Sequence, residues 1–172
     1  MSSSDQIQLW RLAGCAAVLV GLGGCIQPLY APLDGVDVAA QLQAVDIDPI
    51  PERLGHYLHN ELILAFDGTG GGAPKKYHLV VSARERILTP LVDTFSGRAD
   101  SASIAVDADY KLVETQSNTT IASGIALSNA NYDRSAQRFA NIRAARDSEI
   151  RLAKTLADQI RTRIAAALVA KL

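Results

Sequence analysis

The strongest constraint on the fold is a run of three segments in which apolar and polar side chains alternate. The segments cover residues 77–87, 102–112 and 121–127. Apolar residues at every second position are typical of β-strands with one covered face and one more polar face. We expect the covered positions to be Tyr77, Leu79, Val81, Ala83 and Ile87, then Ala102, Ile104, Val106, Ala108, Tyr110 and Leu112, and finally Ile121, Ile125 and Leu127.

Two further segments have the periodicity of amphipathic helices. The first follows Pro51 and carries a stripe formed by Leu54, Leu58, Leu62 and Ala65, continuing through Phe66. The second runs from Asp133 to about Ala170 without a Gly or Pro. Its stripe consists of Ala153, Ala157, Ile160, Ile164 and Leu168, and Phe139 and Ile142 begin a similar stripe earlier. Spacings of three and four residues place each stripe on one helix face. We expect the arginines of the second helix to point mostly away from the sheet.

A fourth strand is expected at Leu42–Asp48, where apolar and acidic residues alternate, and Gln116–Thr119 has the composition of a hairpin turn. The element order is then β-α-β-β-β-α. This order predicts an α+β fold, a two-layer sandwich of a mostly antiparallel four-stranded sheet with two helices.

The amino-terminal residues have the features of a lipoprotein signal. Leu12–Leu22 is uncharged but has only eleven residues, whereas a membrane-spanning helix needs about 20. Leu22-Gly23-Gly24-Cys25 resembles a lipobox, so we expect residues 1–24 to be removed and Cys25 to carry lipid. Leu12-Ala13-Gly14-Cys15 remains an alternative, although the apolar stretch mostly follows Cys15.

The rest of the chain is expected to hold a short tether and one domain. Residues 25–40 are proline-containing and aperiodic, which predicts a tether, and residues 41–172 then form a single periplasmic domain. Ile26 follows the cysteine, and an Asp there is the usual signal for retention at the inner membrane. We therefore expect a protein that is lipid-anchored in the outer membrane, on its periplasmic face.

Catalysis is not supported by the sequence. Cys15 and Cys25 are the only cysteines, so the domain has no thiolate nucleophile or thiolate metal site. The histidines His56 and His59, with Glu61, lack the spacing of a known zinc motif, and Asp107 and Asp109 on one strand face are more often solvated carboxylates than an acid–base pair. We expect no enzyme, no metal and no cofactor. The net charge of −1 gives no reason to expect nucleic-acid binding.

Basic side chains on neighbouring strands form the strongest candidate for a binding site. Arg84 and Arg86 share a strand face, and Lys111 lies on the polar face of the next strand. A guanidinium group makes bidentate contacts with phosphate oxygens, which suits the phosphate of an anionic lipid. The alternative is a solvated face of mixed charge, in which Asp107 and Asp109 neutralise the basic groups.

These features together resemble the LptE family of lipopolysaccharide-assembly lipoproteins. The resemblance rests on Cys25-Ile26-Gln27-Pro28-Leu29-Tyr30, on Asn131-Tyr132-Asp133, and on the helix segments Ala144–Glu149 and Leu156–Ile160. Family members often have Cys-Gly-Phe-x-Pro-Leu-Tyr, and this chain lacks the Gly-Phe pair.

The resemblance implies a specific role without covalent chemistry. A member of this family plugs the outer-membrane β-barrel LptD, supports barrel assembly and contacts lipopolysaccharide on its way to the cell surface. Two alternatives stay open at this point: an auxiliary lipoprotein of a lipid ABC transporter and a periplasmic hydrolase.

Overall fold

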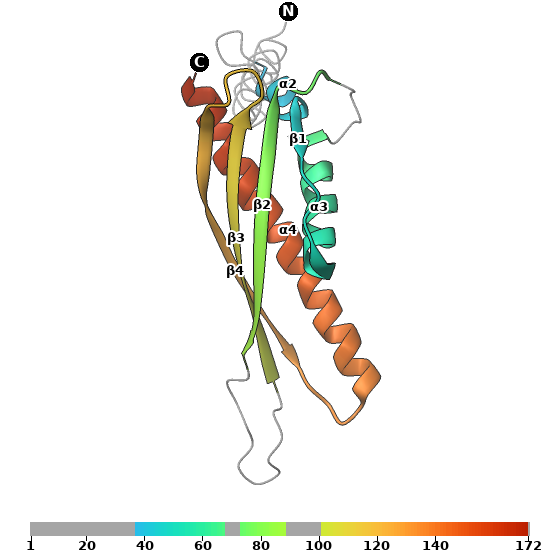
Figure 1. The fold of residues 1–172 in the computed structure, drawn as a ribbon. Helices are drawn as coiled ribbons and strands as arrows, with labels where there is room; N and C mark the ends of the chain where they lie inside the picture. The colour runs from blue at the N-terminus through green and yellow to red at the C-terminus, as the bar shows by residue number, and fades with distance from the viewer. Residues whose placement is uncertain (1–36, 68–72, 89–100, 172) are drawn as a thin grey trace, which may run out of the picture. The chain divides into compact units, whose positions relative to one another are not determined.

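The computed structural model of the chain describes residues 37–67, 73–88 and 101–171 (Figure 1). The predicted signal, Cys25 and most of the predicted tether lie outside these residues. The elements are α2 (Val38–Gln43), β1 (Val45–Ile47), α3 (Glu52–Asp67), β2 (Tyr77–Leu88), β3 (Ser101–Glu114), β4 (Thr120–Asp133) and α4 (Arg138–Lys171).

The four strands form one sheet in the order β1-β2-β3-β4, with α3 and α4 packed beside each other and against the strands (Figure 1). β2, β3 and β4 are antiparallel, whereas β1 is parallel to β2 with Val45 opposite Tyr77. The expected α+β sandwich with a mostly antiparallel sheet is therefore confirmed, and its sheet is mixed because the crossover through α3 returns β2 in the direction of β1.

The first strand is shorter than expected, because a helix occupies part of its predicted range. Leu42 and Gln43 belong to α2, and only Val45–Ile47 is strand. Asp37 caps α2: its Oδ1 accepts a hydrogen bond from Ala40 N at 3.1 Å. A side-chain oxygen at this position satisfies a free amide of the first helical turn, so it favours a helix over a strand.

The predicted stripes of α3 and α4 are largely confirmed. In α3, Leu54, Leu58, Leu62 and Phe66 are buried, and Ala65 is half-buried. In α4, the five stripe residues from Ala153 to Leu168 are buried, but the earlier part of the predicted stripe is wrong, because Phe139 and Ile142 are 83% and 53% exposed in the turns before the core. The core lies between these helices and the inner face of the sheet, and its largest fully buried apolar side chains are Leu42, Leu58, Leu62, Leu79, Ile104, Val106, Leu112, Leu152, Leu156, Ile160 and Ile164.

The covered face was predicted correctly for β3 and wrongly for β4. All six predicted β3 positions are buried, but Ile125 and Leu127 of β4 are 50% and 60% exposed, and Ile121 is half-buried. The register pairs Ala108 with Ala126, so even-numbered residues of β4 share the inner face with those of β3. Ala122 and Ala126 at these positions are short, which lets α4 approach closely. A Cβ at Gly124 would lie 2.8 Å from the Tyr110 hydroxyl, so this glycine makes room for the Tyr110 side chain.

The cover over β2 ends before the strand does. Tyr77, Leu79 and Val81 are buried as predicted, Ala83 is half-buried, and Ile87 is 61% exposed. Glu52, in the first turn of α3, and Glu85 of β2 line the same hollow. The last residues of β2 therefore extend past the helix that covers the rest of the strand.

α4 begins later than the predicted Asp133. Asp133 ends β4 opposite Ser101, and helix starts at Arg138. A short loop closed by Asn141 joins the two: its Oδ1 accepts from Ser135 N at 2.8 Å and its Nδ2 donates to Ser135 O at 2.9 Å. None of residues 138–147 is buried, so the first turns of α4 project beyond the core.

Replacing Gly55 by Ala should destabilise the domain. Ala normally stabilises a helix interior relative to Gly by about 1 kcal/mol. A Cβ at position 55 would, however, lie 2.8 Å from the carbonyl oxygen of Ile50, which is backbone and cannot rotate away. We expect a net loss of about 1–3 kcal/mol in the free energy of unfolding, measured by denaturant titration. Leu64→Ala, at a 66% exposed position of the same helix, serves as the control; an increase in stability for Gly55→Ala would contradict this packing.

Candidate functional site: the outer face of the sheet and the edge of β4

The predicted basic residues lie on the outer face of the sheet, opposite the helices. Arg84 and Arg86 project from β2, and each makes a diagonal ion pair with β3. Arg84 Nη2 lies 2.5 Å from Asp109 Oδ2, and Arg86 Nη2 lies 2.7 Å from Asp107 Oδ2. The two carboxylates therefore neutralise the two guanidinium groups, as the alternative of a mixed-charge face anticipated.

Lys111 shares this face but lies apart from the arginines. The register places it opposite Val80, four residues from Arg84 along β2. At about 3.3 Å per residue, this separation is roughly 13 Å. The structure thus brings Arg84 and Arg86 together, and leaves exposed Lys111 as a separate positive charge.

The arginine pairs are still open to competition from an anion. The side chains of Arg84 and Arg86 are 69% and 62% exposed. Exposed ion pairs contribute only about 0–1 kcal/mol. A phosphate group that makes bidentate contacts can therefore replace the carboxylates at small cost.

The outer face also carries apolar side chains. Val80 is 47% exposed, and Ile125 and Leu127 add their exposed surface at the β4 side. The face combines charged pairs, amides and isolated apolar groups, so it is suited to a polar partner surface rather than to lipid chains.

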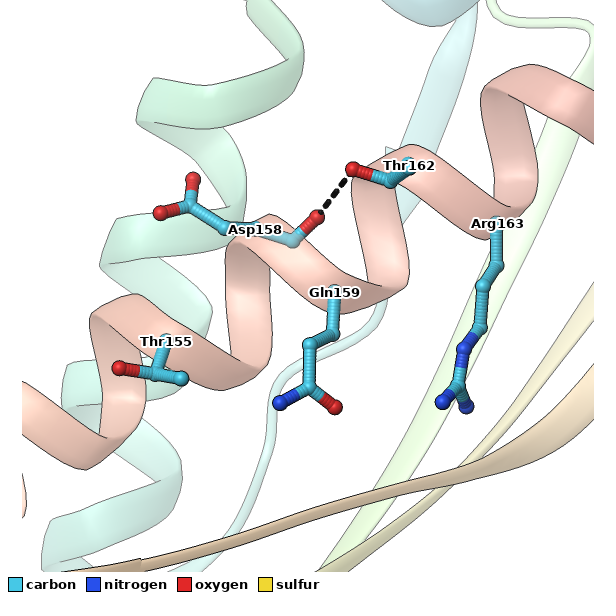
Figure 2. A pocket seen from close by; sticks show the side chains of 5 residues that line it. All are labelled: Thr155, Asp158, Gln159, Thr162 and Arg163. Carbon is cyan, nitrogen blue, oxygen red and sulfur yellow. Dashed lines mark hydrogen bonds between the residues drawn. The ribbon is translucent and has the colours of Figure 1, made fainter.

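Two side chains of α4 reach the edge of β4, where the sheet ends (Figure 2). Gln159 Nε2 donates to Leu127 O at 3.2 Å, and Arg163 Nη1 donates to Ile125 O at 2.5 Å. Arg163 therefore departs from the expectation that the α4 arginines point away from the sheet. Both side chains also line a hollow on α4, together with Thr155, Asp158 and Thr162.

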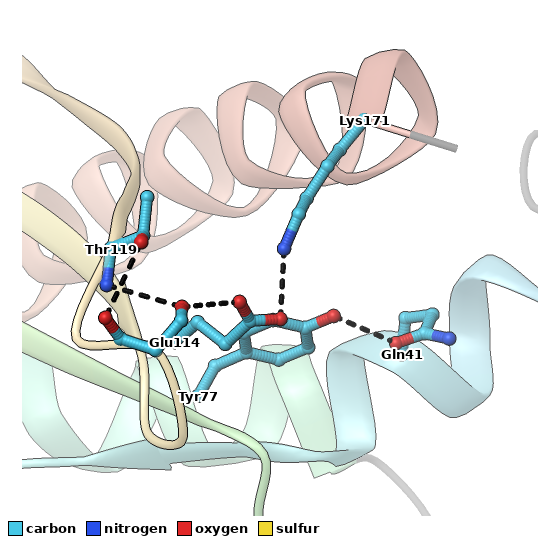
Figure 3. A network of polar contacts seen from close by, with 6 residues as sticks. Gln41, Tyr77, Glu114, Thr119 and Lys171 are labelled. Atoms are coloured by element: carbon cyan, nitrogen blue, oxygen red, sulfur yellow. Dashed lines mark hydrogen bonds and ion pairs between the residues drawn. The ribbon is translucent and has the colours of Figure 1, made fainter.

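A polar network ties the carboxyl end of α4 to the β3–β4 turn (Figure 3). Lys171 Nζ donates to Glu114 Oε1 at 2.8 Å, and Ser117 Oγ donates to Glu114 Oε2 at 2.5 Å. These two hydrogen bonds lower the pKa of Glu114. In the same turn, Asn118 has a φ of 53°, a left-handed conformation that Asn tolerates. The hairpin turn predicted at Gln116–Thr119 is confirmed.

At the other end, a buried carboxylate joins α3 to α4. Glu149 is 1% exposed and accepts two hydrogen bonds from the Arg53 guanidinium. Arg53 Nε donates to Glu149 Oε2 at 2.8 Å, and Arg53 Nη2 donates to Glu149 Oε1. Glu85 of β2 lies within reach of their charges. Burial raises the pKa of Glu85, the Glu149 carboxylate raises it further, and Arg53 lowers it.

The residues considered for a metal or acid–base site do not converge. Within the described ranges, no group of three His, Cys, Asp or Glu is placed to hold a metal ion. His56 is exposed beside Asn60, with 3.2 Å between Nε2 and Nδ2, while His59 is half-buried on the same helix. Asp107 and Asp109 each pair with an arginine. Cys25 lies outside the described residues.

The sequence analysis did not predict the contact of Glu149 with Arg53, or the contacts of Gln159 and Arg163 with the β4 backbone. Glu149 lies four residues before Ala153, in line with the apolar stripe of α4, and this position was a usable signal. Gln159 and Arg163 are also four residues apart and share a face, but nothing in the sequence indicates that this face meets a strand edge.

The comparisons with known proteins give a family from the sequence and a fold from solved structures. The family model described as "LptE: Lipopolysaccharide-assembly" matches residues 41–164. A search of curated proteins gave no match. Within the described ranges, no helix has both the length and the apolar character needed to cross a bilayer.

Three solved structures resemble the chain. A protein of Caulobacter crescentus CB15 described as a candidate lipoprotein has a TM-score of 0.65 and 23% identity, over 80% of this chain and 98% of that one. Rare lipoprotein B of Shewanella oneidensis has a TM-score of 0.54 and 10% identity, over 73% of this chain and 96% of that one. A minor lipoprotein of Acinetobacter baumannii has a TM-score of 0.52 and 15% identity, over 71% of this chain and 90% of that one. At these identities the matches establish a shared fold.

Replacing Glu85 by Gln should stabilise the domain at neutral pH. The folded-state pKa of Glu85 lies above its unfolded value, so ionised Glu85 opposes folding, and this cost disappears as the pH falls through the raised pKa. We expect Tm to rise by about 1–3 °C at pH 7, with no gain below the ordinary Glu pKa of about 4.3. Calorimetry across this pH range tests the effect, with Asp133→Asn as control; a pH-independent shift would contradict it.

Proposed function

The chain belongs to the LptE family of lipopolysaccharide-assembly proteins, and from this premise we propose that it is an outer-membrane lipoprotein that plugs the LptD β-barrel. In this role it supports barrel assembly and assists the transport of lipopolysaccharide to the cell surface. The observation that carries the proposal is the family match over residues 41–164, which spans most of the α+β domain.

The surface of the domain supports a place inside a barrel. The interior of a large outer-membrane barrel is polar, so a plug needs polar surface toward the wall. The outer face of the sheet has this character, because charged pairs, serines and asparagines outnumber its exposed apolar side chains. The domain needs no bound group for this role, and we propose that it performs no covalent chemistry.

Anchoring is proposed through Cys25, with removal of residues 1–24. The segment between Cys25 and the first described helix has twelve residues, Ile26–Asp37. Fully extended, a chain of this length spans at most about 40 Å. A tether of this reach allows the domain to enter a barrel while the lipid stays in the inner leaflet of the outer membrane.

Pull-down of the full-length protein from detergent-solubilised outer membranes tests the proposal. We expect one large β-barrel protein at near-equal amount, and mass spectrometry should find the lipid on Cys25. A Cys25→Ser variant should lose the lipid, while the matched Cys15→Ser variant keeps it. Recovery of an inner-membrane transporter, or of no partner, would contradict the barrel role; acylation of Cys15 would contradict only the anchor.

We further propose that Arg84, Arg86 and Lys111 contact the phosphates of lipopolysaccharide. Because Asp107 and Asp109 neutralise the arginines, Asp107→Asn with Asp109→Asn should tighten binding about two- to tenfold, and Arg84→Gln with Arg86→Gln and Lys111→Gln should weaken it about tenfold. Binding of purified lipopolysaccharide measures both. Arg143→Gln with Arg146→Gln and Lys154→Gln, at exposed positions of α4, removes the same three positive charges and is the matched control; equal effects of the two triple variants would refute this site.

A further inference from the structure

The hydrogen bonds of the β3–β4 hairpin fix where the backbone groups of β4 point. Glu114 N donates to Thr119 O at 2.9 Å, so even-numbered residues of β3 direct their backbone groups toward β4. The register pairs even with even, as in Ala108 with Ala126. In an antiparallel strand successive residues point to opposite sides. The odd-numbered residues 123–133 therefore direct their N–H and C=O groups to the open edge of the sheet.

Among the described residues, this edge lacks the features that usually prevent a strand from pairing with another chain. β4 is 14 residues long, and its register irregularity lies at the turn end, between Leu112 and Val113 of β3. Residues 123–133 contain no Pro and no Lys, and Asp133 at the end is their one charged residue. Edge strands are commonly blunted by such residues or by bulges.

Gln159 and Arg163 protect the edge only in part. They donate to the carbonyl oxygens of Leu127 and Ile125, so they occupy two acceptors, while the N–H groups of the same two residues still point outward. Both donors are the ends of long side chains that approach from α4 (Figure 2). Backbone N–H groups of an added strand can replace them at these oxygens without movement of the main chain.

The surroundings of the edge indicate which side chains an added strand would carry. On the outer face, Ile125 and Leu127 are half exposed or more and offer apolar contacts to alternate residues of a neighbouring strand. On the helix side, the hollow has a volume of about 410 Å³ and is lined by polar residues such as Asp158, Thr162 and Arg163, although most of the surface that they present there is apolar. A segment with apolar side chains toward Ile125 and Leu127, and with long side chains that end in a polar group toward the hollow, matches both sides.

A second copy of the chain is a poor occupant for this edge. α4 carries eight Lys or Arg and three Asp or Glu, and it borders β4. Antiparallel pairing of β4 with β4 about a two-fold axis perpendicular to the sheet would place two helices of net charge +5 on the same side of a joined sheet. The repulsion favours a different chain, and especially one with acidic residues beside the pairing segment.

We propose that the open edge of β4, residues 123–133, binds an extended segment of the partner protein as an added strand. The inference rests on the proposed function, which makes the barrel protein that partner. In the free chain, Gln159 and Arg163 donate hydrogen bonds to the Leu127 and Ile125 carbonyl oxygens. Backbone N–H groups of the bound segment replace these donors. Affinity then comes from main-chain hydrogen bonds, and selectivity comes from the alternating side chains.

Replacing Asn129 by Pro tests the backbone contact in the full chain. Proline removes the outward N–H, and it is tolerated at an edge position whose N–H faces solvent. Asn129→Ala is the matched control, because it removes the side chain and keeps the N–H. With the co-purified barrel protein as the probe, we expect about five- to tenfold weaker binding for Asn129→Pro and less than about twofold for Asn129→Ala. Equal binding of both variants would overturn the proposal.

Hydrogen exchange of the unmodified chain gives a second measurement that does not depend on the folding of a variant. Even-numbered amides of β4 should be protected with and without the barrel protein, and odd-numbered amides should become protected only in the complex. A complex without this alternation overturns the added strand and leaves the plug role intact. Absence of any complex overturns both, and the same protection in a dimer of the free chain assigns the edge to a second copy instead.

Discussion

The close approach of α4 to the sheet is the contact on which the rest of the domain depends. The helix brings Leu152, Leu156, Ile160 and Ile164 into the core, and it contacts β3, β4 and α3. It can lie close to the strands because both surfaces carry small side chains, such as Ala157 on the helix and Ala126 on β4. Packed interiors have little free volume, so larger residues at these positions would separate the layers and leave both helices without a common core.

The sequence predicted the fold wherever a local pattern coincided with burial. The alternation in β3, the stripe of α3 and the second half of the α4 stripe did so, because the large apolar residues there are the covered ones. β4 was assigned to the wrong face since Ile125 and Leu127 are larger than the alanines between them, and size normally indicates burial. Only the pairing of Ala108 with Ala126 shows that the small residues face the helix. That pairing is a long-range property, which a period-two pattern does not contain.

The polar contacts of the candidate site also divide into those that a local sequence pattern predicts and those that depend on long-range packing. Periodicity placed Arg84 and Arg86 on one polar face, and it also placed Asp107 and Asp109 on a polar face of the following strand. The diagonal ion pairs between them depend on strand register. The contacts of Arg53 with Glu149, 96 residues apart, and of Arg163 with the β4 backbone depend on how the helices cross. Such contacts arise only after the layers have assembled.

The projecting start of α4 gives the molecule a mechanical property. Residues 138–147 add about 15 Å of helix that the core does not cover. Long helices curve only gently, so a displacement of these first turns, or of the loop that joins them to β4, is carried to Ser148, where burial in the core begins. The Arg53–Glu149 ion pair lies directly beside Ser148. A force on the first turns of α4 would therefore act on the contact with α3 before it acts on the contacts with the sheet.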